Sequence, residues 1–356
     1  MLAGTHALSA ADLPSRYVKA PLVTDPDSAW TGFYVWGDAA YEAVNLPRYN
    51  LGPATSVGAS TVYGSQIINL DPHATGYSPS GGIGYYLPTG TLPASFGQNV
   101  RVELGGSYVN ATASNSGSAQ YGTPSGGGSF FLLMNNTNVF PSSYGCIGVC
   151  NSSSTLTTSY ASWQVNGRVA SDFTAGAFGL SPSFAVFGGN SRNDQMLTHV
   201  TNNGFMPTDN SNYTAATHLR WTDWGVKSGL AATFEATKAL KLGLSGFIGV
   251  ADRDTRLDGS DLFSDLPYSL GSTIGIGTSR AAFLANLEAS VEYRPVRNVA
   301  LKAFAGLDFD NSVPGIRAPS YNVLSSGADA IIPASINFQN ETSYYAGGGV
   351  QVSFGP

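Results

Sequence analysis

The segment Leu240-Lys-Leu-Gly-Leu-Ser-Gly-Phe-Ile-Gly-Val250 decides the fold class, because two kinds of side chain alternate along it. Successive side chains of an extended strand point to opposite faces. A strand that crosses lipid in a barrel has about 9–11 residues, apolar toward the lipid and polar toward the lumen. The segment therefore predicts a barrel strand, whose apolar face is Leu240, Leu242, Leu244, Ile248 and Val250, and whose polar face holds Lys241, Gly243 and Ser245.

The same alternation recurs along the chain. It is clear in 281–293, 299–309 and 100–104, and weaker in 31–42, 76–87, 159–171, 181–190, 220–236 and 343–354. With 240–250 these make ten candidate strands, an even number, as single-chain bacterial barrels have. We expect an all-β fold, a transmembrane antiparallel β-barrel of about ten strands, with about eight or about twelve as the alternatives.

The connections between these segments alternate in length. Long ones are expected at 43–75, 110–158, 191–219, 253–279 and 310–342, and shorter ones at 88–99, 172–180, 237–239 and 294–298. Outer-membrane barrels combine long extracellular loops with short periplasmic turns, whereas a soluble sandwich has no reason to segregate loop length. We therefore expect both chain ends in the periplasm. Aromatic residues at strand ends fit interfacial girdles, and they are Trp30, Phe33, Trp221, Trp224, Tyr293, Phe309 and Tyr344.

The composition agrees with an unusual solvent. Only 11% of the 356 residues are charged, against roughly 25% in a soluble domain. The 42% of hydrophobic residues is too high for a disordered chain, yet no run approaches the roughly 18 apolar residues of a membrane-spanning helix. The net charge of -6 and the absence of a basic run argue against a nucleic-acid partner.

The N-terminal residues have the features of an export leader. Residues 1–11 end in small residues, as before a signal-peptidase site, but lack a basic start and a full apolar stretch. We interpret them as a residual signal-peptide-like segment. The Pro-punctuated residues 12–29 are then a periplasmic leader, and 30–356 form the barrel.

A family resemblance rests on Ala10-Ala-Asp-Leu-Pro-Ser-Arg16, Lys19-Ala-Pro21 and Trp30-Thr-Gly-Phe-Tyr-Val35. These stretches resemble the mature start of alphaproteobacterial outer-membrane β-barrels of the immunogenic, porin-like class. The end of the chain, Gly349-Val-Gln-Val-Ser-Phe354, resembles the C-terminal assembly signal of such barrels through Gly349, Val352 and Phe354. The resemblance implies a bacterial outer-membrane location, outer-membrane lipid and lipopolysaccharide as surroundings, and insertion by the barrel-assembly machinery.

Charged residues on the polar faces are expected to point into the lumen, because a charge facing lipid near the midplane costs roughly 2–4 kcal/mol. Acids slightly outnumber bases, which favours cations if the lumen conducts. A barrel of this size is close to the limit that side chains can fill, so a filled lumen and a narrow channel both remain open. The expected lumen charges are Asp38, Glu42, Arg101, Glu103, Arg168, Asp223, Lys227, Glu235, Lys241, Arg253, Glu288, Glu292, Lys302 and Asp308.

The connection 110–158 holds the chain's two cysteines and an apolar run. Cys146 and Cys150 are too few for a structural zinc site, and we expect a small disulfide loop between them. The run Phe130-Phe-Leu-Leu-Met134 fits a loop that folds into the barrel mouth or caps it. It fits equally an extracellular hairpin that continues the strands.

Known catalytic and metal-binding patterns find little support. His73, His199 and His218 are expected to be solvated loop residues, although Asp194, His199 and Asp209 share one connection. Such a set is common in polar loops, so we expect no enzyme, with an outer-membrane hydrolase as a remote alternative. Asp252-Arg-Asp-Thr-Arg-Leu-Asp258 lacks the order of a calcium loop and is expected to be a solvated charged loop. Glycines at 81–84 lack the lysine and helix of a phosphate loop, so we expect neither metal nor cofactor.

The sequence therefore supports two kinds of function. The first is a porin-like narrow channel or a structural envelope protein, which passes at most small polar solutes or ions. The second is a surface-interaction protein, adhesin-like or receptor-like, whose loops bind a partner on a barrel that does not conduct. Conductance separates the two.

Overall fold

The computed structural model describes residues 32–51, 68–87, 97, 99–121, 150–203, 210–265, 268–296, 298–318, 320–323 and 329–354. Strands account for nearly all of these residues. Among them there is no helix with the length and apolar character to span a membrane.

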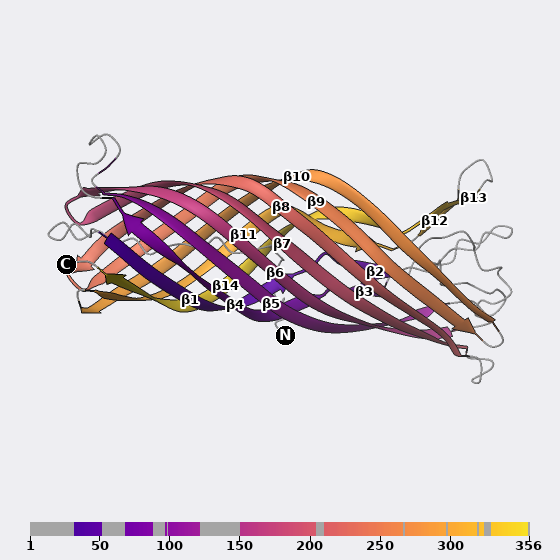
Figure 1. Ribbon diagram of the computed structural model, residues 1–356. Coiled ribbons are helices and arrows are strands. Elements are labelled where there is room, and N and C mark those ends of the chain that lie inside the picture. Colours follow the sequence, from indigo (N-terminus) through magenta and orange to yellow (C-terminus); the bar gives the residue numbers. More distant parts are fainter. Residues whose placement is uncertain are drawn as a thin grey trace, which may run out of the picture.

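Ten antiparallel strands form one closed barrel (Figure 1), in the spatial order β1-β14-β11-β10-β9-β8-β7-β6-β5-β4. The first and last strands pair, with Phe33 opposite Phe354, and this pairing closes the wall. The predicted fold class and strand number are confirmed. The strands are β1 (Gly32–Asn45), β4 (His73–Tyr86), β5 (Asn99–Tyr121), β6 (Cys150–Ala175), β7 (Phe178–Asn203), β8 (Asn210–Thr237), β9 (Leu240–Asp265), β10 (Tyr268–Val296), β11 (Val299–Arg317) and β14 (Ser335–Phe354).

Two short hairpins are not part of the barrel wall and form sheets of their own. They are β2 (Tyr49–Leu51) with β3 (Ile68–Leu70), and β12 (Ser320–Val323) with β13 (Asp329–Ile332). The β2–β3 hairpin runs within the outline of the wall in Figure 1. The backbone N–H of Leu46 donates to the carbonyl of Pro72, which holds the two ends of this excursion together.

The connections differ from the predicted lengths mostly at the end with the long loops. The short connections lie where they are expected, at 176–177 between β6 and β7 and at 238–239 between β8 and β9, but the first is shorter than the predicted 172–180 because β6 continues to Ala175 and β7 begins at Phe178. Two of the predicted long connections, 191–219 and 253–279, are instead mostly strand, because β7 to β10 continue well past the expected ends. The segment 252–258, predicted to be a solvated loop, is part of β9.

Near the short turns, the outward face of the wall is apolar. On β8 it carries Phe234, Leu230, Val226 and Trp224, which are between 39% and 67% exposed. This band covers about 11 residues of strand, the span expected for a tilted strand that crosses a bilayer. It forms the lipid-facing surface of the barrel.

Beyond the band the two faces exchange character. On β8 the outward residues become polar at Arg220 and His218, and the inward ones become apolar at Trp221 and Leu219. Trp221 is 1% exposed, so its assignment to an interfacial girdle was wrong. The physical reason is that water replaces lipid outside this half of the barrel, so the apolar side chains turn inward.

The glycines of β4 make room for large inward side chains. A Cβ at Gly84 would lie 2.1 Å from the ring of Tyr34, which is fully buried on the neighbouring strand. This close approach is the role expected for strand glycines.

Candidate functional site

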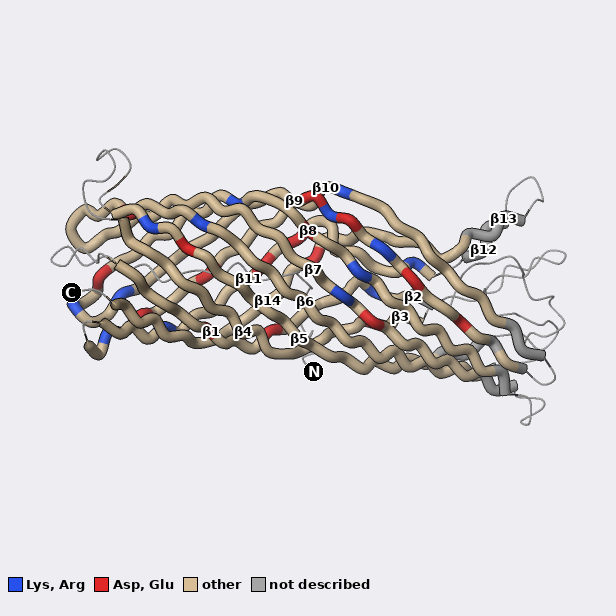
Figure 2. Tube along the Cα trace, viewed as in Figure 1, with Lys and Arg blue, Asp and Glu red and all other residues tan. Residues whose placement is uncertain are grey.

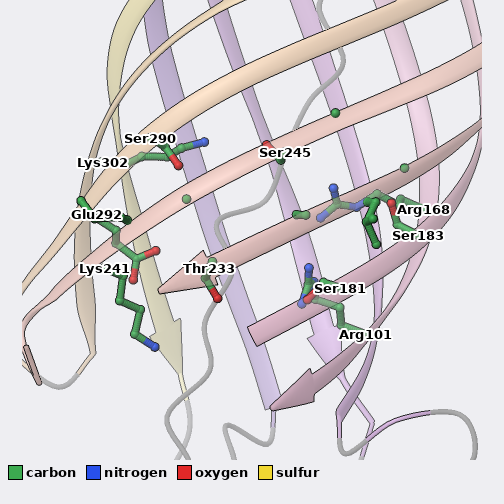
Figure 3. Close-up of a pocket in the computed structure, with 16 residues that line it drawn as sticks. Arg101, Arg168, Ser181, Ser183, Thr233, Lys241, Ser245, Ser290, Glu292 and Lys302 are labelled. Atoms are coloured by element: carbon green, nitrogen blue, oxygen red, sulfur yellow. The ribbon is translucent and has the colours of Figure 1, made fainter. Parts of the chain in front are cut away.

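A polar cavity occupies the interior close to the short turns (Figure 3), and we call it the vestibule. It encloses about 610 Å³, part of which is open to solvent. Its walls combine cations and hydroxyl groups with a single carboxylate, that of Glu292. The lining side chains that can hydrogen-bond are those of Arg101, Arg168, Ser181, Ser183, Thr233, Lys241, Ser245, Ser290, Glu292 and Lys302.

The cations of the vestibule are neutralised by carboxylates of the wall. Arg101 donates from Nε to Oε1 of Glu103 at 2.9 Å and also contacts Asp172. Arg168 forms an ion pair with the same Glu103. Because Asp172 and Glu103 are buried, these charges fix the cations in place rather than leave them mobile.

A second layer of paired charges crosses the interior between β10, β11 and β14. Lys302 Nζ donates to Glu288 Oε1 at 2.9 Å, and the Tyr345 hydroxyl donates to Glu288 Oε2 at 2.9 Å. The amide of Asn286 donates to the Tyr345 oxygen and to Asp308. Tyrosine and amide groups thus complete the hydrogen bonding of the charged pair, as a buried pair requires.

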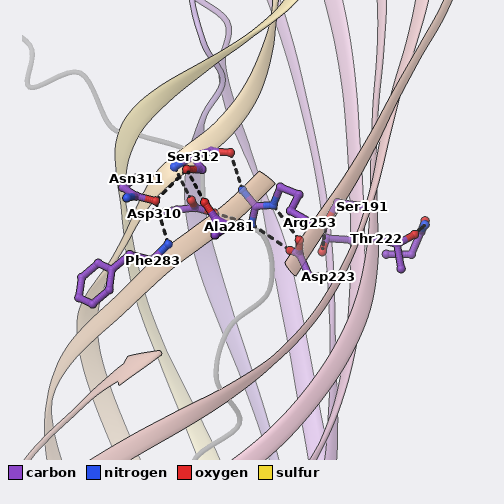
Figure 4. A network of polar contacts seen from close by, with 11 residues as sticks. Ser191, Thr222, Asp223, Arg253, Ala281, Phe283, Asp310, Asn311 and Ser312 are labelled. Carbon is purple, nitrogen blue, oxygen red and sulfur yellow. Dashed lines mark hydrogen bonds and ion pairs between the residues drawn. The ribbon is translucent and has the colours of Figure 1, made fainter. Parts of the chain in front are cut away.

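Arg253 is the centre of a third layer, at the outer edge of the apolar band (Figure 4). Its Nε and Nη2 donate to the two carboxylate oxygens of Asp223 at 2.7 and 2.9 Å. Nη2 also donates to Asp310 at 2.7 Å, and Nη1 donates to the carbonyl of Ser312 at 2.7 Å. These hydrogen bonds connect Arg253 of β9 to β8 and β11. They lie at the point where the pairing of β10 with β11 ends, beyond Leu284 and Asp310.

Lys227 lies in the same part of the interior but has mainly aromatic neighbours. Its Nζ is 4.1 Å from the ring centre of Phe187 and 4.6 Å from that of Phe247. It also donates to Gln164 Oε1 at 3.2 Å. These contacts replace the water that the buried ammonium group loses.

The outer half of the interior contains a large apolar cluster, which we call the outer core. None of its wall residues Leu156, Tyr160, Leu197, Leu219 and Leu257 is more than 1% exposed. The ring centres of Tyr160 and Trp221 are 6.1 Å apart. The β2–β3 hairpin packs into this cluster through Tyr49, Ile68 and Leu70, which are 2%, 3% and 0% exposed. Apolar side chains therefore occupy the path between the vestibule and the outer mouth.

The structure places the charges expected in the lumen as follows. Asp38 and Glu235 are half-buried, and the other twelve are buried. Two further buried acids belong to the same layers and were not expected, Asp172 and Asp310, because the first was assigned to a turn and the second to a loop. Continuing the alternation by two residues beyond Ala170 and Asp308 would have identified both.

The histidines are not all solvated, contrary to expectation. His199 is fully buried in the outer half, with Nδ1 2.5 Å from Ser154 Oγ. Asp194 instead faces outward and pairs with His218 Nδ1 at 2.7 Å. Asp194 and His199 therefore lie on opposite faces of β7 and cannot act on one substrate together.

Burial lowers the pKa of His199 to about 4, which predicts acid sensitivity. Between pH about 6.5 and about 4 the unfolded chain binds a proton that the folded barrel rejects, so folding stability falls as pH falls through this window, by at most about 3 kcal/mol. Burial raises the pKa of Glu341 to about 7, which acts in the opposite direction. Glu341 is present in both the wild type and His199→Gln, so its contribution cancels in a comparison of the two. The measurement is the difference between their free energies of unfolding in urea, at pH 7.5 and at pH 5. The advantage of the wild type over the variant should shrink at pH 5, and a constant difference contradicts the assignment.

Two expectations concern the ends of the chain and its cysteines. Phe354 faces outward and is 61% exposed. Any side chain larger than glycine at position 349 would collide with the carboxylate of Asp38, which points inward. Recognition of Gly349, Val352 and Phe354 by assembly machinery stays a prediction. The Phe130–Met134 run and residues 1–29 lie outside what the structure describes. The predicted Cys146–Cys150 disulfide does too, because Cys146 is not described and Cys150 is described only as backbone.

No protein-family model and no curated protein matches the chain. Among solved structures it is similar to the outer membrane protease OmpT from Escherichia coli, at 8% identity and TM-score 0.43, covering 90% of this chain and 97% of that one. It is also similar to a Pseudomonas aeruginosa FadL homologue (8%, TM-score 0.24, 91% and 90%) and to the translocator domain of the autotransporter NalP from Neisseria meningitidis (11%, 0.22, 91% and 89%).

Proposed function

We propose that the chain is a structural protein of the bacterial outer membrane, a barrel whose lumen is closed and which has no enzymatic role. The observation that carries the proposal is the outer core, where the β2–β3 hairpin inserts Tyr49, Ile68 and Leu70 among buried wall residues. Apolar side chains that fill most of a constriction disfavour ions, because ions cannot keep their hydration there.

The paired charges of the interior also support a closed lumen. Arg253, Asp223 and Asp310 are held by short hydrogen bonds and do not line an open path. Such a network rigidifies the interior when every charge has a partner. A closed and rigid barrel that raises strands well beyond the membrane is suited to maintaining the envelope and to presenting its outer loops to a surface partner.

A porin-like narrow channel is the second candidate, and the vestibule favours it. The vestibule is a polar space near the short turns, partly open to solvent, that small polar solutes could enter. Transport would then require the β2–β3 hairpin to leave the outer core. The two candidates therefore predict opposite behaviour for the wild-type barrel, which is impermeable under the first and permeable under the second.

Liposome swelling with a small sugar tests the proposed plug. The wild-type barrel is expected to give no swelling above empty liposomes, whereas the triple variant Tyr49→Ser, Ile68→Ser, Leu70→Ser should admit the sugar, because polar side chains no longer hold the hairpin in the apolar cluster. Asp71→Asn is the matched control, since Asp71 belongs to the same excursion and its ion pair within the described part of the chain is with the exposed Arg48. Swelling by the wild type and by Asp71→Asn alike would instead support the channel.

A further inference from the structure

Three arginines form a row across the outer surface of the wall. Arg192 of β7 is opposite Arg220 of β8, and Arg220 is opposite Arg256 of β9. All three side chains are exposed on the outward face. Figure 2 shows the charged positions that gather on these strands beyond the middle of the barrel. Residues opposite each other on neighbouring strands have Cβ atoms about 4.5–5.5 Å apart, so like charges placed there repel.

The outer two arginines are neutralised within the protein, but the middle one is not. Arg192 Nε is 2.8 Å from Asp194 Oδ2, and Arg256 Nε is 2.9 Å from Asp258 Oδ2. Among the residues that the structure describes, Arg220 has no ion pair. An anion from outside the chain would relieve the repulsion at this position.

On the β7 side, the surroundings of Arg220 toward the membrane are neutral, whereas the carboxylate beyond it, Asp194, is already paired with Arg192 and His218. Next to it toward the membrane lie Asn190 and Thr222, opposite each other on β7 and β8 and joined by a 3.1 Å hydrogen bond. On β9 the residue opposite Thr222 is Asp254, and Asp252 lies opposite Trp224; both carboxylates repel an anion. The favourable place for a negative group is therefore between β7 and β8.

The height of this place relates it to the lipid surface. On each of the three strands the arginine lies six residues beyond an exposed valine of the apolar band, namely Val186, Val226 and Val250. Arg220 is four residues beyond the exposed Trp224. Along the membrane normal this places Arg220 about 10 Å farther out than Trp224, for a strand tilted by about 40°. A long arginine side chain can reach back over much of that distance to the headgroups.

We propose that Arg220, with Arg192, Asn190 and Thr222, binds the phosphate group of a phosphorylated lipid in the outer leaflet. Guanidinium groups are well suited to phosphate oxygens, and the neutral donors complete its hydrogen bonding. Charge–charge attraction and the height above the band both favour a headgroup that is anchored in the membrane. The site lies on the outer wall and is independent of whether the lumen is closed.

The test uses the full chain refolded in a neutral detergent, with diphosphoryl lipid A as the probe and native mass spectrometry as the readout. Arg220→Gln should weaken retention of the lipid about tenfold, the effect of losing one charge-assisted hydrogen bond. Lys238→Gln is the matched control, because it removes an exposed cation at the opposite end of β8, and it should retain the lipid like the wild type. Asp254→Asn should retain the lipid at least as well as the wild type.

Three results would overturn the proposal. Equal retention by Arg220→Gln and Lys238→Gln would exclude the site, provided that both variants show the heat-dependent gel shift of a folded barrel. Equal retention of fully dephosphorylated lipid A would show that the acyl chains, not the phosphates, are recognised. Complete displacement of the lipid by excess inorganic phosphate would show that a free anion, not a lipid, is the ligand.

Discussion

Arg253→Met is expected to destabilise the folded barrel by about 3–5 kcal/mol, because it leaves the buried carboxylates of Asp223 and Asp310 without their cation. Both acids are buried, and the Arg253 side chain is fully so. Methionine fills a similar length but donates no hydrogen bond. Urea unfolding of the refolded protein in lipid vesicles, followed by tryptophan fluorescence, measures the change.

The control for this prediction lies on the same strand. Arg256 faces outward and is 73% exposed, so Arg256→Met should leave the unfolding midpoint almost unchanged. The triple variant Asp223→Asn, Arg253→Met, Asp310→Asn removes the uncompensated charges and should recover much of the loss. If Arg253→Met and Arg256→Met have the same midpoint, the third layer does not hold β11 to β8 and β9 as described.

Leu244→Arg is expected to impair insertion into lipid, whereas Ser245→Arg should be much milder. Leu244 is 54% exposed within the apolar band, and an arginine facing lipid costs about 2–4 kcal/mol near the midplane. Ser245 is its neighbour on the other face, lines the vestibule and lies opposite the inward Glu288 of β10, so a cation there faces a polar interior rather than lipid. The readout is the fraction of chain that shows the heat-dependent gel shift after refolding into vesicles.

Equal yields for the two variants would contradict the face assignment of β9. The comparison is sharp because the two positions are adjacent in sequence and the substituted side chain is the same. Only the direction in which the side chain points differs between them.

Alternation along the strands predicted the lipid-facing half of the barrel well. Leu242, Leu244 and Val250 face outward, as the pattern of β9 indicated. Lys241 and Arg253 are buried on the opposite side. The period of two is enforced by the backbone, and the solvent on each side selects the residue type.

The outer half was mistaken for loops because the same alternation continues there with the faces exchanged. On β8, Tyr213, Leu219 and Trp221 are inward and apolar, whereas farther down Val226 and Leu230 are outward and apolar. A test that requires one apolar face along a whole strand stops where lipid gives way to water. Allowing a single exchange of faces would have extended β7 to β10 to their observed lengths.

Other features depend on contacts that local sequence does not encode. The β2–β3 hairpin consists of two three-residue strands, too short to produce a periodic pattern, and its place in the barrel depends on side chains from most of the surrounding strands. The pairing of Asp223 with Arg253 follows from the register set by the turn at 238–239. The contribution of Asp310 from β11 follows only from closure of the barrel.

The most direct test of the closed lumen is single-channel recording of the refolded full chain in a planar bilayer, after the heat-dependent gel shift has shown that it is folded. The outer core predicts no reproducible open level for the wild type under moderate voltage, and discrete openings for the variant with serine at Tyr49, Ile68 and Leu70. A stable open level in the wild type, with an ion selectivity that changes when Lys302 or Glu292 is substituted, would contradict closure and make the protein a channel.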